Sequence, residues 1–284
     1  MRFALLLVGV LACASSVIFV RESQQSAAWL AVWRLWVAVL CLLPWAWRDY
    51  QRLRPDIKIL LRQAWLPGCV LGLHFIAWNA GARMVPAAMG TLLVNLTPLV
   101  MPGLLWCLYR QRVTPREWQA TAMALCGFFI LSWSTLQWDM AYWQGSAVVL
   151  LAMLSFALYL ASAASSHIGR NIGSIWLYLL PVYAVAGVLC LVLSWLTEPF
   201  HGFVDGYDML MTVSLGLVST VIGHSILNWC MQHISGQRVT VVNSMQFVFA
   251  GVLGWWWYGE LPGLAFYAAS GLILMSLLWL AQEA

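Results

Sequence analysis

Charged side chains are scarce in this sequence. Only 8% of the 284 residues are Asp, Glu, Lys or Arg, whereas soluble domains carry roughly 25%. Hydrophobic residues account for 63% of the chain. With so few charges, a folded chain cannot cover its surface with polar groups, so the composition excludes a soluble globular protein. Most of the chain must have lipid as its solvent.

The signatures of several enzyme and binding classes are also missing. We find no Gly-rich Walker loop, no nucleotide-binding glycine pattern and no nucleophile elbow, which argues against ATP-driven pumping by this chain. The seven cysteines lie in apolar stretches, and no pair has metal-ligand spacing. We therefore expect no cofactor and no metal site, with cysteines that pack as small apolar side chains.

Apolar runs fill nearly the whole chain. A helix needs about 20 apolar residues to cross the hydrocarbon core, which limits this chain to about ten crossings. Charges, prolines and glycine clusters separate runs near residues 3–20, 28–47, 64–83, 87–109, 117–136, 145–166, 174–196, 209–230, 239–258 and 263–281. The sequence thus predicts an all-α integral membrane protein with ten transmembrane helices. Nine runs follow the first, so we expect it to be a span and not a cleaved signal peptide.

The basic residues indicate the orientation of these spans. Lys and Arg accumulate in short cytoplasmic loops. If the N-terminus is cytoplasmic, only Arg21 and Arg83 lie outside, Arg34 falls within a span, and eleven lie inside: Arg2, Arg48, Arg52, Arg54, Lys58, Arg62, Arg110, Arg112, Arg116, Arg170 and Arg238. We expect a multi-pass protein of the cell inner membrane with both termini cytoplasmic. The net charge of +4 then reflects topology, and no nucleic-acid partner is expected.

The two halves of the sequence resemble each other at an offset of 149 residues. Asn79 then meets Asn228, and Thr91 meets Thr240. Each half holds five spans, and because five is odd, the halves enter the membrane from opposite sides. We therefore predict two inverted five-helix repeats, residues 1–136 and 145–284. Many secondary transporters have this design, with the substrate site near the midplane between the halves.

Motifs in both halves resemble those of the EamA families of the drug/metabolite transporter (DMT) superfamily. The first half carries Asn95-Leu96-Thr97-Pro98, the basic loop Arg110-Gln111-Arg112 and then Gly127. The second half carries Phe249-Ala250-Gly251 and Gly259-Glu260. The resemblance covers nearly the whole chain. It implies an exporter of amino acids or similar metabolites, with ten helices around a central cavity.

Two positions depart from the family pattern. Gln111 stands where the first-half motif usually has Glu, and Met245-Gln246-Phe247 stands where the second half often reads Leu-Glu-Pro. An amide at position 246 cannot carry a proton as a carboxylate does, which argues against proton coupling at this position.

Polar side chains inside the predicted spans are few, and such groups usually face a cavity or a partner. We expect a substrate site formed by Arg34, His74, Trp78, Asn79, Asn95, Tyr159, His224, Asn228, Asn243 and Gln246, with Ser15 and Ser16 beside it. Arg34 could meet a substrate carboxylate. Alternatively, it reaches the membrane interface or pairs with Glu22. For the amides, the alternative is hydrogen bonding between helices.

The two histidines share helix faces with other candidates. By i,i+4 spacing, His74 lies on one face with Trp78, and His224 with Asn228. Histidine is the side chain whose ordinary pKa lies near neutrality, so either ring could carry a coupled proton. The alternative is a hydrogen-bonded packing residue.

The leading interpretation is a secondary transporter that exports a small, zwitterionic metabolite such as an amino acid or a derivative of one. It is expected to act as a monomer on a small-molecule substrate within the lipid bilayer. A metallophore or drug exporter of the same fold is one alternative and would need a larger cavity. An integral-membrane enzyme is another, but it would need catalytic groups clustered at one interface. The polar residues are spread over both halves, so we expect a transporter and not an enzyme.

The predicted topology can be tested with single cysteines in a cysteine-free background. Gln51→Cys should react with a membrane-impermeant maleimide only after the inner membrane is permeabilised, whereas Gly202→Cys should react in intact spheroplasts. We expect this result because Lys and Arg are concentrated in the loops on the side of Gln51, which marks that side as cytoplasmic. The reverse labelling pattern would show that the topology is wrong.

Overall fold

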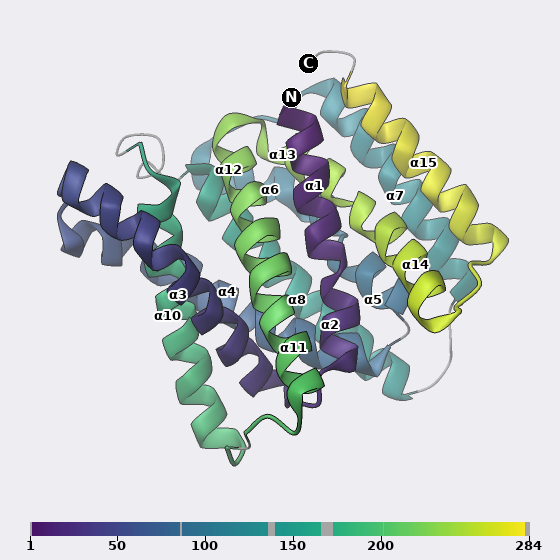
Figure 1. Cartoon of the computed structure of the whole chain (residues 1–284). Helices are drawn as coiled ribbons and strands as arrows, with labels where there is room; N and C mark the ends of the chain where they lie inside the picture. Colours follow the sequence, from purple (N-terminus) through teal and green to yellow (C-terminus); the bar gives the residue numbers. More distant parts are fainter. Residues whose placement is uncertain (1, 86, 136–139, 166–172, 201, 282–284) are drawn as a thin grey trace.

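The structure is a computed structural model that describes residues 2–85, 87–135, 140–165, 173–200 and 202–281. Across these ranges it contains helices and no strand. Nine helices of the described part are long and apolar enough to cross a membrane. The start of α1 (Arg2–Ala14) and the end of α15 (Leu264–Ala281) lie at the same end of the bundle (Figure 1). The expected all-α membrane architecture is confirmed.

The helices follow the expected spans in order, and four of the spans consist of two or three consecutive helices. The first half contains α1, α2 (Ser16–Glu22), α3 (Ala27–Leu53), α4 (Ile57–Met84), α5 (Ala87–Val94), α6 (Thr97–Tyr109) and α7 (Pro115–Thr135). The second half contains α8 (Met140–Ser165), α10 (Ile175–Thr197), α11 (Gly206–Ser214), the π-helical segment η1 (Leu215–His224), α12 (Ser225–His233), α13 (Gly236–Asn243), α14 (Met245–Tyr258) and α15.

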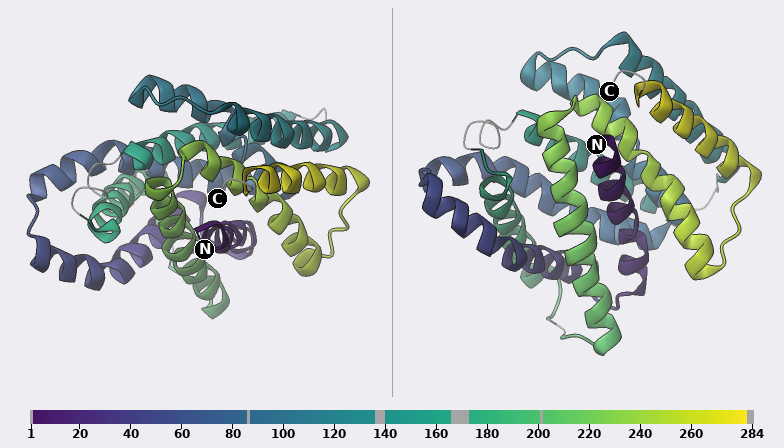
Figure 2. Two further views of the ribbon diagram at one scale, coloured as in Figure 1. Left: turned by 90° about the horizontal axis from the view of Figure 1, so that it is seen from above. Right: turned by 45° about the horizontal axis from the view of Figure 1, so that its top comes forward.

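The expected span at residues 117–136 corresponds to α7 (Pro115–Thr135), which is not among the nine candidate spans. Its first turns carry Arg116, Glu117 and Gln119, so it is less apolar than the nine candidate spans. It packs along α15, and the pair forms one edge of the bundle, while α3 and α10 form the opposite edge (Figure 1 and Figure 2). Between these edges, α4 packs along α8, and α1 packs against η1.

Large apolar side chains cover the outside of the bundle as well as its core. Trp133 and Trp256 are 74% and 71% exposed, as expected for groups that contact lipid or the membrane interface. Phe75, Tyr159 and Tyr183 are fully buried. The polar groups are concentrated in the interior and at the helix ends, which is the distribution that a lipid solvent selects.

Three spans are interrupted, and polar side chains hydrogen-bond to the backbone at each interruption. Between α1 and α2, the Ser15 hydroxyl donates to Ala12 O at 2.7 Å. Between α5 and α6, Asn95 Nδ2 donates to Thr91 O at 2.7 Å and Thr97 Oγ1 donates to Val94 O at 3.0 Å. Between α13 and α14, Ser244 Oγ donates to Thr240 O at 3.4 Å. Such bonds allow a helix to break inside a membrane.

Two glycines allow α1 and η1 to approach closely. A Cβ added at Gly223 would lie 2.6 Å from Cys13 Sγ, 3.0 Å from Cys13 N and 3.2 Å from Gly9 O. A Cβ at Gly9 would lie 2.7 Å from Cγ2 of Ile226. Because the atoms facing Gly223 include backbone atoms of α1, they cannot move without shifting the helix.

Gly223→Ala should therefore destabilise the protein by about 1–3 kcal/mol, the usual cost of overpacking. The measurement is the apparent melting temperature of the purified protein in detergent. Gly271→Ala in α15 is the matched control, because no atom lies within 4 Å of the added Cβ and alanine favours helix over glycine. An unchanged melting temperature for Gly223→Ala would contradict the close packing described here.

Candidate functional site

A small cavity lies where the interrupted helices meet. Its volume is about 20 Å³, room for about one water molecule. The lining residues come from both halves of the chain and are Cys13, Ser16, Arg34, His74, Phe75, Trp78, Val94, Asn95, Phe156, His224 and Gln246. Six of the ten residues expected at the site are among them: Arg34, His74, Trp78, Asn95, His224 and Gln246. Ser16 is also present.

Arg34 is the charged group of this lining. It projects from α3 and is only 1% exposed. Its Nε donates to Thr220 Oγ1 at 3.1 Å, and its Cζ lies 3.7 Å from the centre of the Phe75 ring. Nη1 is buried and has no hydrogen-bond partner in the described part of the protein. Glu22, the alternative partner considered from the sequence, instead accepts a hydrogen bond from Tyr207 at 2.9 Å.

The two histidines lie close together in the same cavity. Their ring centres are 6.2 Å apart. His74 Nδ1 donates to Ala152 O at 2.9 Å, and its ring stacks on Phe156 at 4.7 Å. His224 packs edge-on against Phe75 at 5.1 Å. In the described part of the chain, its Nδ1 is buried without a partner. The two rings come from equivalent spans of the two halves, α4 and η1.

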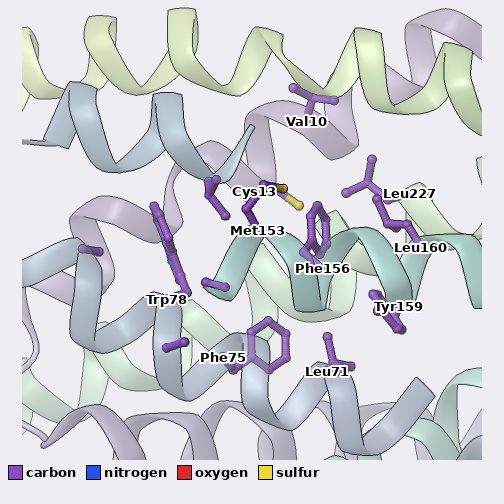
Figure 3. Close-up of a cluster of buried hydrophobic side chains, with 14 of the residues drawn as sticks. Val10, Cys13, Leu71, Phe75, Trp78, Met153, Phe156, Tyr159, Leu160 and Leu227 are labelled. Carbon is purple, nitrogen blue, oxygen red and sulfur yellow. The ribbon is translucent and has the colours of Figure 1, made fainter. Parts of the chain in front are cut away.

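Aromatic side chains occupy the space around these polar groups. Figure 3 shows Phe75 and Trp78 on α4, with Phe156 on α8 and Cys13 on α1 near them. Sequence reasoning missed Cys13, Phe75, Val94 and Phe156. In a chain that is mostly apolar, an apolar residue at the cavity carries no signal that distinguishes it from one facing lipid.

A row of amides joins two of the helix interruptions. Gln246 Nε2 donates to Asn243 Oδ1 at 2.6 Å, and Asn243 Nδ2 donates to Asn95 Oδ1 at 3.0 Å. Asn95 and Gln246 line the cavity, and Asn243, which is not a lining residue, hydrogen-bonds to both. The amide row therefore connects the α5–α6 break of the first half to the equivalent α13–α14 break of the second.

Besides Asn243, three expected site residues lie outside the cavity lining. Asn79 Nδ2 donates to Ala27 O at 3.0 Å and so ties α4 to the start of α3. Asn228 Nδ2 donates to Tyr159 Oη and to His224 O. Tyr159 and Asn228 therefore form a second layer behind His224, while Asn79 lies nearer one end of the bundle. The repeat relation between the two asparagines does not bring them to one surface.

The end of the bundle opposite the termini is held by a polar cluster that we call the distal network: Arg21, Arg83, Asp208 and Glu260. Arg83 lies at the end of α4. Its guanidinium donates to Val20 O, Ser23 O and Gln25 O at 2.7–3.0 Å. These carbonyls belong to the end of α2 and to the turn before α3. Arg83 thus fastens this turn to α4.

The other members of the distal network link the two halves. Asp208, on α11, accepts hydrogen bonds from Ser23 Oγ, Gln24 N and Gln25 Nε2 at 2.7–2.9 Å. Arg21 forms an ion pair with Glu260 at 3.3 Å and donates to Val85 O at 3.0 Å. The turn between α2 and α3 is therefore held from both sides, by the first half through Arg83 and by the second through Asp208.

At the end that carries the termini, a larger hollow of about 650 Å³ opens between the halves. Arg2, Phe3, Gln111, Arg112, Thr114, Glu117, His233, Ile234, Ser235 and Arg238 line it. Several contacts cross between the halves beside it, among them the following two. Gln237 Nε2 donates to Pro98 O at 3.0 Å, and Arg238 pairs with Glu117 at 3.3 Å.

Comparison with known proteins agrees with this architecture. The model of the EamA-like transporter family matches residues 2–133 and 143–282. The "Uncharacterized transporter YdfC" of Bacillus subtilis (strain 168) is 25% identical over 236 residues, which are 83% of this chain and 75% of that protein. A solved crystal structure, described only as that of a protein, superposes on 100% of this chain and 98% of its own. Its TM-score is 0.79 at 16% identity, a likeness of fold alone.

The family match covers both halves separately, as the internal repeat predicts. The matched ranges include the motifs around Asn95 and Glu260, and the resemblance to this family is confirmed. The chain is a multi-pass, two-repeat membrane protein and belongs to the EamA-like transporter family.

Proposed function

We propose that the protein is a secondary transporter of the cell inner membrane that exports a small metabolite, such as an amino acid or an amino-acid derivative, by alternating access. Both termini are cytoplasmic in this proposal, the monomer is the working unit, and the chain is not an enzyme. The observation that carries the proposal is the polar cavity built at the helix interruptions by both halves. In inverted-repeat carriers, interrupted helices at the midplane form the substrate site.

The size of the cavity supports alternating access. A volume of about 20 Å³ is too small for any amino acid, so the halves must separate before a substrate can enter. The interruptions beside Ser15, Asn95 and Ser244 supply points at which half-helices can tilt, because side chains already satisfy part of the backbone there. In this proposal the structure is a closed state of the transport cycle.

The distal network has the position of an outer gate. With cytoplasmic termini, it faces the periplasm, where an exporter must release its substrate. Opening would require the α2–α3 turn to leave Arg83, Asp208 or both. Hydrogen bonds to charged groups contribute about 1.5–3 kcal/mol each, so this network stabilises the closed form.

Of the competing functions, an integral-membrane enzyme fits the cavity less well. A membrane enzyme would need a catalytic group beside an aqueous interface, whereas Arg34, His74 and His224 are all buried. These three residues come from both halves, which supports a site that opens and closes between the halves.

The export function can be tested by comparing metabolites in the medium by mass spectrometry. Overexpression should raise the extracellular level of at least one small metabolite above that of cells with an empty vector, and deletion of the gene should lower it. Unchanged extracellular metabolites in both strains, with the protein present in the membrane, would contradict export.

The gate can be tested with Arg83→Gln. This change removes the charged donor of three carbonyls, and loss of about 1.4 kcal/mol from the closed state shifts the equilibrium tenfold. A cysteine at Ser16, in a cysteine-free background, should then react about tenfold faster with an impermeant maleimide added from the periplasm. Arg52→Gln, an exposed arginine at the other end of the bundle, is the matched control. Equal labelling in both variants would rule out the gate.

A further inference from the structure

Arg34 is a buried cation whose charge no side chain of the cavity balances. None of the cavity-lining residues is Asp or Glu. Arg21, Arg48 and Arg238 each pair with a carboxylate, whereas Arg34 has no such pair among the described residues. A charged group removed from water is costly unless an opposite charge or hydrogen-bond acceptors replace its hydration. The site therefore lacks one negative charge.

The Arg34 side chain is held in a defined position. Thr220 Oγ1 accepts from Nε at 3.1 Å and donates in turn to Leu215 O at 3.3 Å, within the π-helical segment. The Phe75 ring covers one face of the guanidinium at 3.7 Å. These contacts use Nε and one face but leave Nη1 buried and unpartnered. The planar fork of an arginine binds a carboxylate through two parallel hydrogen bonds.

The charge balance distinguishes between kinds of carboxylate. A monoanion bound to Arg34 would give a neutral complex, which can be enclosed in a low-dielectric cavity at the least cost. A zwitterion would add an ammonium group, and the described lining offers it no negative charge. The rest of the lining suits an uncharged body: Asn95 and Gln246 can hydrogen-bond to it, and Trp78 and Phe156 can pack against it.

We propose that the substrate is a small monocarboxylate anion whose remaining part is uncharged, such as an N-acylated or deaminated amino acid, with its carboxylate bound by Arg34. This assignment rests on the proposed transport function and narrows its substrate class. Arg34 is then the residue that selects for charge, while the aromatic side chains limit the size and shape of the body.

The test uses four probes built on one scaffold that differ in charge: N-acetylphenylalanine, phenylalanine, phenylalanine amide and N-acetylphenylalanine amide. A matched set on alanine covers a smaller body. Binding is measured on the purified full-length protein in detergent by calorimetry and by quenching of tryptophan fluorescence. The N-acetyl acids should bind at least tenfold more tightly than the zwitterions, and the two amides should bind more weakly still.

Variants separate the charge of Arg34 from its position. Arg34→Gln should weaken binding of the N-acetyl acids at least tenfold and leave the weak binding of the uncharged amide unchanged. Arg34→Lys should recover only part of the loss, because an ammonium lacks the planar fork. Thr220→Val keeps the charge and removes its tether, so a smaller loss of a few-fold is expected. If gel filtration shows that Arg34→Gln does not fold, Thr220→Val provides the test in its place. Arg52→Gln is the control for both variants.

Three outcomes would overturn the assignment: the cationic amide binds as tightly as the N-acetyl acid, a folded Arg34→Gln protein binds the acids like the wild type, or no carboxylate in the panel binds the wild type. Failure of the assignment is distinguishable from failure of transport. If the protein exports a cationic or uncharged metabolite, the monoanion assignment is wrong and the transport function stands. If carboxylates bind in an Arg34-dependent way but nothing is exported from cells, the assignment stands and the transport function is wrong.

Discussion

The hydrogen-bonding demand of the backbone in lipid is the constraint on which this structure depends. A helix in a membrane cannot leave its carbonyl and amide groups unpaired, so interruptions are possible only where side chains replace the missing bonds. Here Ser15, Asn95, Thr97 and Ser244 do so. Lining residues adjoin all three interruptions. The same feature that permits the breaks thus creates a place inside the bundle where polar side chains from both halves gather.

The large-scale fold could be predicted because lipid imposes a simple rule. Runs of about 20 apolar residues had to be helices, and their number followed from the length of the chain. The interruptions were harder to predict. Pro98 is a recognisable signal at the start of α6, but Ser15 and Ser244 are residues that also occur in uninterrupted membrane helices.

The residues of the candidate site also fall into two groups, those that could be predicted from the sequence and those that could not. Arg34 and the two histidines could be chosen from the sequence because charged and titratable groups are rare in a membrane interior. Asn79 and Asn228 carried the same kind of signal but bond to neighbouring groups outside the cavity. The NH2 group of each asparagine donates to a nearby backbone carbonyl, whereas a guanidinium with five donors needs several acceptors. The aromatic walls, Phe75 and Phe156, could be found only from the structure.

The distal network has a property that bears on how it tolerates change over evolution. Arg83 binds carbonyl oxygens of Val20, Ser23 and Gln25 and no side chain of these residues. Substitutions at the three positions leave those acceptors in place, so their identity is free to vary as far as Arg83 is concerned. An insertion or deletion in the turn would displace all three carbonyls together. The contact therefore constrains the length and path of the chain between α2 and α3 more than its composition.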